Sequence, residues 1–154
     1  MSAANFGQRL IRRAARVVLL DEADRFLLFR YAPDGMAPFW FPPGGACEDG
    51  EDFATAARRE LFEETGIRAE PLPLGRVTEY DYTTGEGVRA RAIEHWFHWR
   101  TAVSRIDTGG HTEVERRFMT EHRWLTVAEL HGWPETVYPA DLAALIGTLA
   151  RKAA

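Results

Sequence analysis

The sequence predicts an α/β fold in which a mixed β-sheet lies between helices. Three observations predict this class: a hairpin pattern near the N-terminus, an amphipathic helix that ends at Gly66, and strand-like runs followed by helical patterns in the remaining chain. With 154 residues, the chain has the length of one domain with its own hydrophobic core. We therefore expect one domain over residues 14–154, preceded by an N-terminal arm over residues 1–13.

The first third of the chain predicts a hairpin and a short strand. Residues 14–20 are aliphatic and β-branched, and the polar residues 21–25 separate them from a second apolar run over residues 26–31. This order is typical of two antiparallel strands joined by a turn. Residues 39–41 predict a third, short strand. The Pro-Pro-Gly-Gly segment over residues 42–45 predicts a stiff loop whose glycines permit close approach to a ligand.

The second half of the stretch Gly45–Ile67 is predicted to be helical. Ala54, Ala57 and Leu61 recur at helical spacing and give the segment one apolar stripe to bury. We expect Gly66 to end the helix, because glycine readily adopts the left-handed conformation found just after helix ends.

Two longer strands are expected after this helix, over residues 76–82 and 88–102, with a glycine-containing turn between them. Alternation places His95 and His98 on opposite faces, so these histidines cannot bind one metal ion. Aromatic side chains of this region could stack on a nucleobase, although most strand aromatics pack in a core. These aromatic residues are Tyr80, Tyr82, Trp96 and Trp99.

The C-terminal part predicts a polar segment, one strand and two helices. Residues 103–121 are rich in charge and contain two adjacent glycines, and residues 122–125 are typical of a final strand. Thr126 is a suitable N-cap for a short helix to His131, because a glutamate stands three residues later as in a capping box. Residues 139–152 carry an apolar stripe that indicates a last helix packed on the sheet.

The composition excludes several classes of function. The formal net charge of −4 gives no overall attraction to polymeric nucleic acid or to an anionic membrane. No apolar run approaches the ~20 residues that a membrane span requires. Cys47 is the only cysteine, so no disulfide forms within the chain, and a reducing, cytoplasmic location is expected. We expect a small molecule as partner, and the sequence leaves a homodimer open.

Three carboxylates converge on the predicted helix. Glu60, Glu63 and Glu64 stand at positions i, i+3 and i+4, which places them in one arc of the helix surface. Their mutual repulsion costs about 0.2–0.5 kcal/mol per pair, and the helix dipole also disfavours them. A divalent cation such as Mg²⁺ or Mn²⁺ reverses these effects because it prefers oxygen ligands. On the helix alone, a solvated acidic face with Arg59 paired to Glu63 is the commoner arrangement.

The residues upstream complete a longer pattern. Gly45 is followed after five residues by Glu51, and after seven more by the run Arg59-Glu60-Leu61-x-Glu63-Glu64-x-Gly66-Ile67. This resembles the signature of the Nudix hydrolases, G-x5-E-x7-R-E-U-x-E-E-x-G-U with U aliphatic, at all nine specified positions. Such a match at fixed spacing rarely arises by chance. The resemblance implies a MutT-like α/β/α sandwich with an intact Nudix box at Gly45–Ile67.

The resemblance also implies roles for individual residues. In this family the three helix carboxylates hold Mg²⁺ or Mn²⁺, and the carbonyl group that matches Gly45 can join them. The pair matching Glu51 and Arg59 mainly holds the loop against the helix. An acid outside the signature often completes the metal shell or deprotonates the water, and Glu113 and Glu115 are the candidates here. The catalytic candidates are Glu51, Arg59, Glu60, Glu63 and Glu64, and the metal-ligand candidates are Gly45, Glu60, Glu63 and Glu64.

Arginines near the first strand are candidates for contact with phosphate. Arg12, Arg13 and Arg16 carry guanidinium groups that pair well with phosphate oxygens, although such residues more often solvate a strand end. We take Arg16 as the substrate-binding candidate, together with the loop acids Glu113 and Glu115.

The implied function is hydrolysis, by water, of a phosphoanhydride in a nucleoside diphosphate linked to another group X. Two other functions occur on the same fold: a nucleotide sensor without hydrolysis, and an isomerase of prenyl diphosphates. The intact acidic set argues against a sensor. The position of Cys47 inside the signature argues against the isomerase, whose proton donor is expected on a separate strand. The signature specifies the bond that is cut and not the identity of X.

Overall fold

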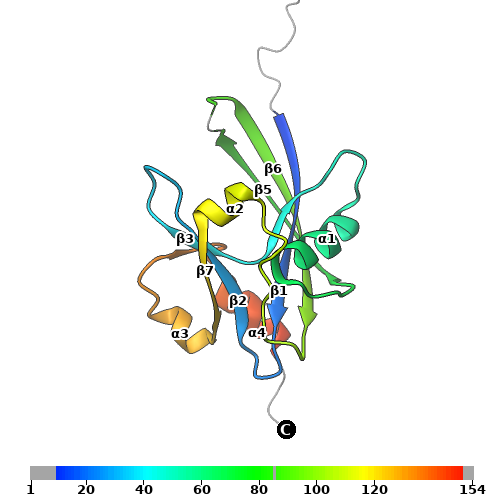
Figure 1. The fold of residues 1–154 in the computed structure, drawn as a ribbon, viewed down its shortest axis with the longest axis vertical. Helices are drawn as coiled ribbons and strands as arrows, with labels where there is room; N and C mark the ends of the chain where they lie inside the picture. The colour runs from blue at the N-terminus through cyan, green and yellow to red at the C-terminus, as the bar shows by residue number, and fades with distance from the viewer. Residues whose placement is uncertain (1–9, 85, 151–154) are drawn as a thin grey trace, which may run out of the picture.

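The computed structural model describes residues 10–84 and 86–150, which form a sheet covered by helices (Figure 1). The predicted arm over residues 1–13 needs a correction at its end, because residues 10–13 already belong to the first strand. Residues 1–9 of that prediction lie outside the described residues. No helix in the described part is long and apolar enough to cross a membrane.

The described strands form one mixed sheet. They are β1 (Leu10–Leu20), β2 (Phe26–Tyr31), β3 (Phe39–Phe41), β4 (Gly44–Ala46), β5 (Leu72–Thr83), β6 (Arg89–Arg100), β7 (Met119–Leu125) and β8 (Thr136–Val137). Six follow the order β5-β6-β1-β2-β3-β8, while β4 pairs with β1 and β7 pairs with β2. The β1–β6 and β3–β8 pairs are parallel and the others are antiparallel, which confirms the predicted mixed sheet.

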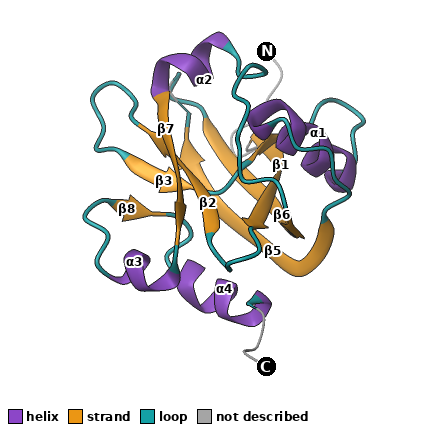
Figure 2. Ribbon diagram, turned by 60° about the horizontal axis from the view of Figure 1, so that its bottom comes forward, coloured by secondary structure: helices purple, strands orange, loops and turns teal. Residues whose placement is uncertain are grey.

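Helices lie on both faces of this sheet. The described helices are α1 (Phe53–Thr65), α2 (Glu113–Phe118), α3 (Val127–His131) and α4 (Leu142–Leu149). Helix α1 covers one face and α4 covers the other, while α2 leads directly into β7 (Figure 2). The predicted α/β class, with the sheet between helices, is therefore confirmed.

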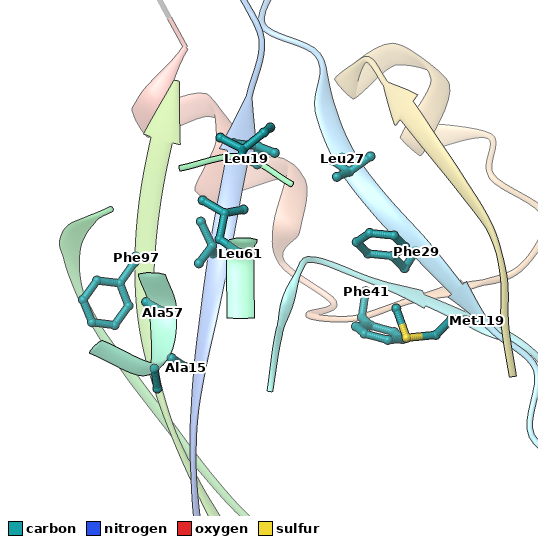
Figure 3. Packing of buried hydrophobic residues seen from close by; sticks show 12 residues of the cluster. Ala15, Leu19, Leu27, Phe29, Phe41, Ala57, Leu61, Phe97 and Met119 are labelled. Atoms are coloured by element: carbon teal, nitrogen blue, oxygen red, sulfur yellow. The ribbon is translucent and has the colours of Figure 1, made fainter. Parts of the chain in front are cut away.

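Strand β1 supplies core residues to both faces, because alternate side chains of a strand point in opposite directions. On the α1 side, Ala15 and Leu19 belong to one buried cluster with Ala57 and Leu61 (Figure 3). Burial of a leucine side chain such as that of Leu61 contributes about 1.5–3 kcal/mol. The cluster on the α4 side includes Val18, Leu20, Trp96, Leu142 and Ile146.

Strands β1 and β2 separate from each other along their length. They pair at Leu20 and Phe26, beside the turn that joins them. Farther from this turn, β1 pairs with β4, with Arg16 opposite Gly44, whereas β2 pairs with β3 and β7. The sheet therefore forks into a β1 branch (β4, β1, β6 and β5) and a β2 branch (β7, β2, β3 and β8). Residues from both branches line the main cavity described below.

The sequence signals for helix ends predict two boundaries correctly. Gly66 follows α1 with a φ of 76°, and its N–H donates to the carbonyl of Phe62 at 2.8 Å. Thr126 and Glu129 form the predicted capping box at the start of α3. The last helix is shorter than predicted, since α4 spans Leu142–Leu149.

Three short elements were not predicted. The segment over residues 42–45, predicted to be a loop, contributes to β4, and the polar segment over residues 103–121 contains α2. Strand β8 was also missed, because its two residues carry too little alternation to detect. For α2 a signal was present in the sequence, since Thr112 and Glu115 have the spacing of a capping box and form one in the structure.

Candidate functional site

Arg59 and Glu51 hold the loop before α1 against that helix. The Nε and Nη2 atoms of Arg59 each donate to the Glu51 carboxylate at 2.8 Å, and Nη2 also donates to the carbonyl of Ala46 at 3.0 Å. A bidentate pair of this kind is the strong form of the arginine–carboxylate interaction. The hydrogen bonds from Arg59 lower the pKa of Glu51 below its ordinary value. These contacts make both residues supports of the loop.

Two glycines allow β4 to pass directly beside the carboxylates of α1. A Cβ atom at Gly45 would lie 2.6 Å from the carboxylate of Glu60, so a side chain there would displace Glu60. Gly44 donates its N–H to Glu64 at 3.1 Å, and a Cβ atom at this position would lie 2.1 Å from the carbonyl oxygen of Ala15. The Gly-Gly sequence is therefore required by contacts on both sides of the strand.

Three carboxylates meet beside β4. One oxygen each from Glu60, Glu64 and Glu115 lies within 4.8 Å of the other two. Two of these residues come from α1, as the sequence predicts, and the third comes from α2. Glu63 lines the same cavity but is not part of the three-carboxylate cluster. Arg59 Nη1 donates to both Glu60 and Glu63, at 3.0 and 3.1 Å.

Contacts with the C-terminal end of α1 position the segment that carries Glu115. The buried His111 donates from Nε2 to the carbonyl oxygen of Glu64 at 2.9 Å. A capping box then begins α2 and orients its first turn. As a result Glu115 reaches the carboxylates of α1, whereas Glu113 is not among the residues that line the cavity.

Glu60 and Glu64 are carboxylates in a largely buried position. Burial raises the pKa of both groups, and repulsion from Glu60 raises that of Glu64 further. The N–H of Gly44 and the charge of Arg16 act in the opposite direction on Glu64. Divalent cations favour the ionised form of such groups and prefer oxygen ligands, so this donor set fits Mg²⁺ or Mn²⁺.

The raised pKa of Glu64 predicts a pH-dependent difference in stability between the wild type and Glu64→Gln. A carboxyl group whose pKa is higher in the folded state stabilises the fold fully below its unfolded pKa, and this contribution is lost as pH rises through the folded pKa. Without metal, the variant should therefore be more stable than the wild type at neutral pH. The gap should close as the pH falls towards the ordinary pKa of a glutamate.

Thermal unfolding in EDTA across this pH range measures the difference. Glu60, Glu115 and Arg16 face Glu64 and are unchanged between the two proteins, so the comparison isolates the one carboxyl group. A stability gap that stays constant with pH would contradict a raised pKa for Glu64.

The three carboxylates form part of the wall of a cavity of about 940 Å³. Aromatic rings of the β2 branch form another part, where the ring centres of Phe39 and Phe41 lie 5.4 and 6.0 Å from that of Tyr31. Flat apolar rings of this kind suit the face of a nucleobase. The cavity thus combines an acidic wall, which fits a metal ion, with an aromatic wall.

Arg16, the predicted substrate-binding residue, lies in the wall of this cavity on the β1 branch. Its Nε donates to the buried carboxylate of Glu94 at 2.9 Å, and its guanidinium group lies 5.2 Å from the ring centre of Phe41. The side chain is 19% exposed. Arg16 is therefore held in place by the protein while it faces the cavity.

The aromatic candidates from the sequence have different positions. Tyr80 lines the cavity, whereas Trp96 is 1% exposed and belongs to the core on the α4 side. Tyr82 and Trp99 do not line this cavity. The aromatic wall of Tyr31, Phe39 and Phe41 was missed, because strand composition does not show which strands will diverge. Its one sequence signal is that Phe39–Phe41 precedes the Pro-Pro-Gly-Gly segment.

Comparison with known proteins gives one family for most of the chain. The family model described as the NUDIX domain matches residues 10–145. An RNA pyrophosphohydrolase of Acidiphilium cryptum is 30% identical over 139 residues, which cover 82% of this chain and 77% of that protein. An RNA pyrophosphohydrolase of Dinoroseobacter shibae is 52% identical over 62 residues, or 40% of this chain, and this match spans only 38% of that relative's length.

Solved structures show the same fold. The dihydroneopterin triphosphate pyrophosphohydrolase of E. coli superposes with a TM-score of 0.65 and covers 91% of this chain and 97% of its own, at 21% sequence identity. At this identity the likeness concerns the fold alone. It agrees with the forked mixed sheet and the helices on both faces described above.

Proposed function

This chain belongs to the NUDIX family, and on that premise we propose that it hydrolyses a phosphoanhydride in a nucleoside diphosphate linked to another group X. Water is the nucleophile, and Mg²⁺ or Mn²⁺ is required. The observation that carries the proposal is the meeting of Glu60, Glu64 and Glu115 in the wall of a cavity of about 940 Å³. A diphosphate repels such a wall unless cations lie between them, so the acidic cluster and the anionic substrate require the same metal.

We assign metal binding to the carboxylates of the site and positioning of β4 to Arg59 and Glu51. Glu60 and Glu64 hold the cation from α1, with Glu63 and the carbonyl of Gly45 as further candidates for its shell. When bound, the cation supplies charge neutralisation of the diphosphate and lowers the pKa of a coordinated water. Arg59 and Glu51 keep β4 against α1, so that a diphosphate meets the carboxylates at a fixed distance from the strand.

Glu115 is the acid we propose to complete the site, either as a ligand or as the base that takes the proton from water. Its Oε1 accepts the N–H of Thr112 at 2.9 Å, which leaves Oε2 for a metal ion or a water. Glu115→Gln should lower turnover by about 10²–10³-fold, in the range of lost general-base catalysis. Glu113→Gln, two residues away on the same helix, is the matched control and should leave turnover unchanged. Equal losses in both variants, measured as kcat with Mg²⁺, would assign the effect to α2 as a whole.

The test of the proposed function is a substrate panel assayed with Mg²⁺ and with EDTA as control. The panel contains nucleoside triphosphates, nucleotide sugars, dinucleoside polyphosphates and RNA with a 5′-triphosphate end, since the relatives named above are RNA pyrophosphohydrolases. Release of phosphate, pyrophosphate or a mononucleotide that stops in EDTA is the expected result. Tight binding of one member without release of any product would instead favour the sensor, and rearrangement of a prenyl diphosphate would favour the isomerase.

The expected partner is thus a small nucleotide or a nucleotide at the end of a chain. The net charge of −4 still argues against extended contact with polymeric nucleic acid, so recognition of an RNA would concern its terminal phosphates. The cytoplasmic location and the homodimer stay predictions from the sequence.

A further inference from the structure

A second, smaller cavity of about 170 Å³ adjoins the main one on the β1 branch. Arg12, Arg16, Gly45, Ala46 and Tyr80 line both cavities, so the two share a boundary along β1 and β4. The small cavity is distinguished by Tyr82 and Glu94, which line it but not the main cavity. Because of its size it can take a small group and not a nucleoside.

The strand register explains why this space exists. Ala14 lies between Glu94 of β6 and Ala46 of β4, and Arg12 pairs with Ala92 of β6. Paired residues share one face of a sheet, so alanines form the floor and leave room above it. Larger side chains from the same face, those of Arg12, Arg16, Tyr80 and Tyr82, form the walls.

The polar groups on these walls lack partners. Arg16 Nη1 and the Tyr82 hydroxyl are buried side-chain atoms with no hydrogen-bond partner in the part of the chain that the structure describes. Arg12 makes no ion pair with any described residue. Buried polar groups without partners are rare in folded proteins, and each one calls for a ligand or a water. Two such atoms at one small cavity indicate a site.

The carboxylate that lines this cavity, that of Glu94, already accepts hydrogen bonds from within the protein. Glu94 is 1% exposed, and its carboxylate accepts hydrogen bonds from Arg16, Thr78 and Tyr138. The groups left for a ligand therefore include the guanidinium groups of Arg12 and Arg16 and the hydroxyl of Tyr82, all of which can donate. Among the residues that line this cavity, Arg12 and Arg16 face the single carboxylate of Glu94, so the charge of the lining is positive. A ligand that only accepts hydrogen bonds and carries negative charge matches this set.

We propose that the small cavity binds a phosphate group carried by X, next to the diphosphate that is cleaved. This inference rests on the proposed function and narrows it to substrates with at least three phosphates, such as a nucleoside triphosphate, a dinucleoside polyphosphate or a 5′-triphosphate end. The diphosphate lies against β4 and the α1 carboxylates, and the additional phosphate lies beyond Gly45 and Ala46, against Arg12, Arg16 and Tyr82.

The direct test is a calorimetric titration, in Mg²⁺, with inorganic tripolyphosphate and with pyrophosphate as probes. The double variant Arg12→Gln/Tyr82→Phe removes an exposed charge and an unpartnered hydroxyl, so neither change breaks a contact within the protein. We expect it to bind tripolyphosphate at least about tenfold more weakly, because one charge-assisted hydrogen bond and the hydrogen bond from the Tyr82 hydroxyl are lost, and to bind pyrophosphate as the wild type does. Arg89→Gln is the matched control, because Arg89 neighbours Ala90 on β6 but points to the opposite face. Equal affinities of the wild type and the double variant for tripolyphosphate, or an equal loss in Arg89→Gln, would overturn the proposal.

Turnover then distinguishes the sources of the additional phosphate. The substrates ADP-glucose, ATP and diadenosine tetraphosphate share a nucleoside and differ in whether X is neutral, a phosphate or a phosphorylated nucleoside. The double variant should raise the KM for the phosphate-bearing X that the cavity accepts and leave kcat unchanged, with no effect on ADP-glucose. An equal rise for ADP-glucose would contradict the subsite. If no substrate is cleaved, the proposed function fails, while the titration still decides whether the anion site exists.

Discussion

Glu64→Gln is expected to lower turnover by about 10²–10³-fold while the fold persists, as for the loss of a strong electrostatic contact to the reacting group. Glutamine has nearly the same shape as glutamate and keeps an oxygen that can accept the N–H of Gly44. The change therefore removes a charge and little else. Glu64 is 1% exposed, so its negative charge lowers the stability of the metal-free protein, and a bound cation would offset this cost.

Three measurements on this variant separate its effect on the stability of the metal-free protein from its effect on metal binding and turnover. Without metal at neutral pH its unfolding temperature should exceed that of the wild type, because one of two neighbouring buried carboxylates becomes neutral. The rise of that temperature on adding Mg²⁺ should shrink, since ligand binding to the folded state is what produces it. Glu70→Gln is the control, because Glu70 lies on the surface in a pair with Arg58. Near wild-type turnover of Glu64→Gln on the best substrate would remove Glu64 from the mechanism.

Arg59→Met is expected to destabilise the fold by about 2–3 kcal/mol and to lower activity as well. Methionine keeps much of the apolar stem but none of the donors. The Glu51 side chain is 9% exposed and would lose both hydrogen bonds from Arg59, and the carbonyl of Ala46 would lose its donor. The loop would then no longer be fixed to α1 at the carboxylates.

Urea unfolding of Arg59→Met beside Arg58→Met checks this assignment. Arg58 is the preceding residue and pairs with Glu70 on the surface, where an ion pair is worth at most about 1 kcal/mol. Arg59→Lys keeps the charge but cannot reproduce the bidentate contact, so it should recover only part of the lost stability. Equal destabilisation by the changes at positions 58 and 59 would show that the hydrogen bonds of Arg59 contribute no more to the free energy of unfolding than a surface ion pair.

The parts of the fold that the sequence predicts are those governed by local periodicity. The aliphatic run over residues 14–20 and the helical spacing of Ala57 and Leu61 indicate which side chains must be buried, and the structure buries most of them. Ala54, the third residue of the predicted stripe on α1, is exposed, so that part of the prediction was wrong. Gly66 and Thr126 predict helix ends because capping depends on residues within one turn. Strand β4 was missed because its residues, Gly-Gly-Ala, have low strand propensity and its pairing with β1 is a long-range contact, whereas the aromatic residues of β3 favour a strand.

In the candidate site, too, local spacing predicts some residues, whereas others depend on tertiary packing. The positions of Glu60 and Glu64 follow from helical spacing, so the sequence alone predicts that they converge. The choice of Glu115 over Glu113 depends on how His111 packs on the end of α1, which no local pattern contains. Glu63 illustrates the converse, because spacing places it near the others while its carboxylate lies outside the three-carboxylate cluster.

The three carboxylates of the acidic cluster come from elements on both branches of the forked sheet. Glu60 and Glu64 stand on α1, which packs on the β1 branch, whereas Glu115 stands on α2, which continues into β7 of the β2 branch. Strands β1 and β2 themselves pair at Leu20 and Phe26, at the closed end of the fork. A cation shared by the three carboxylates would act as a crosslink near the open end. Metal loading would then stiffen the whole fork and fix its width, and with it the span of phosphates that the cleft can hold.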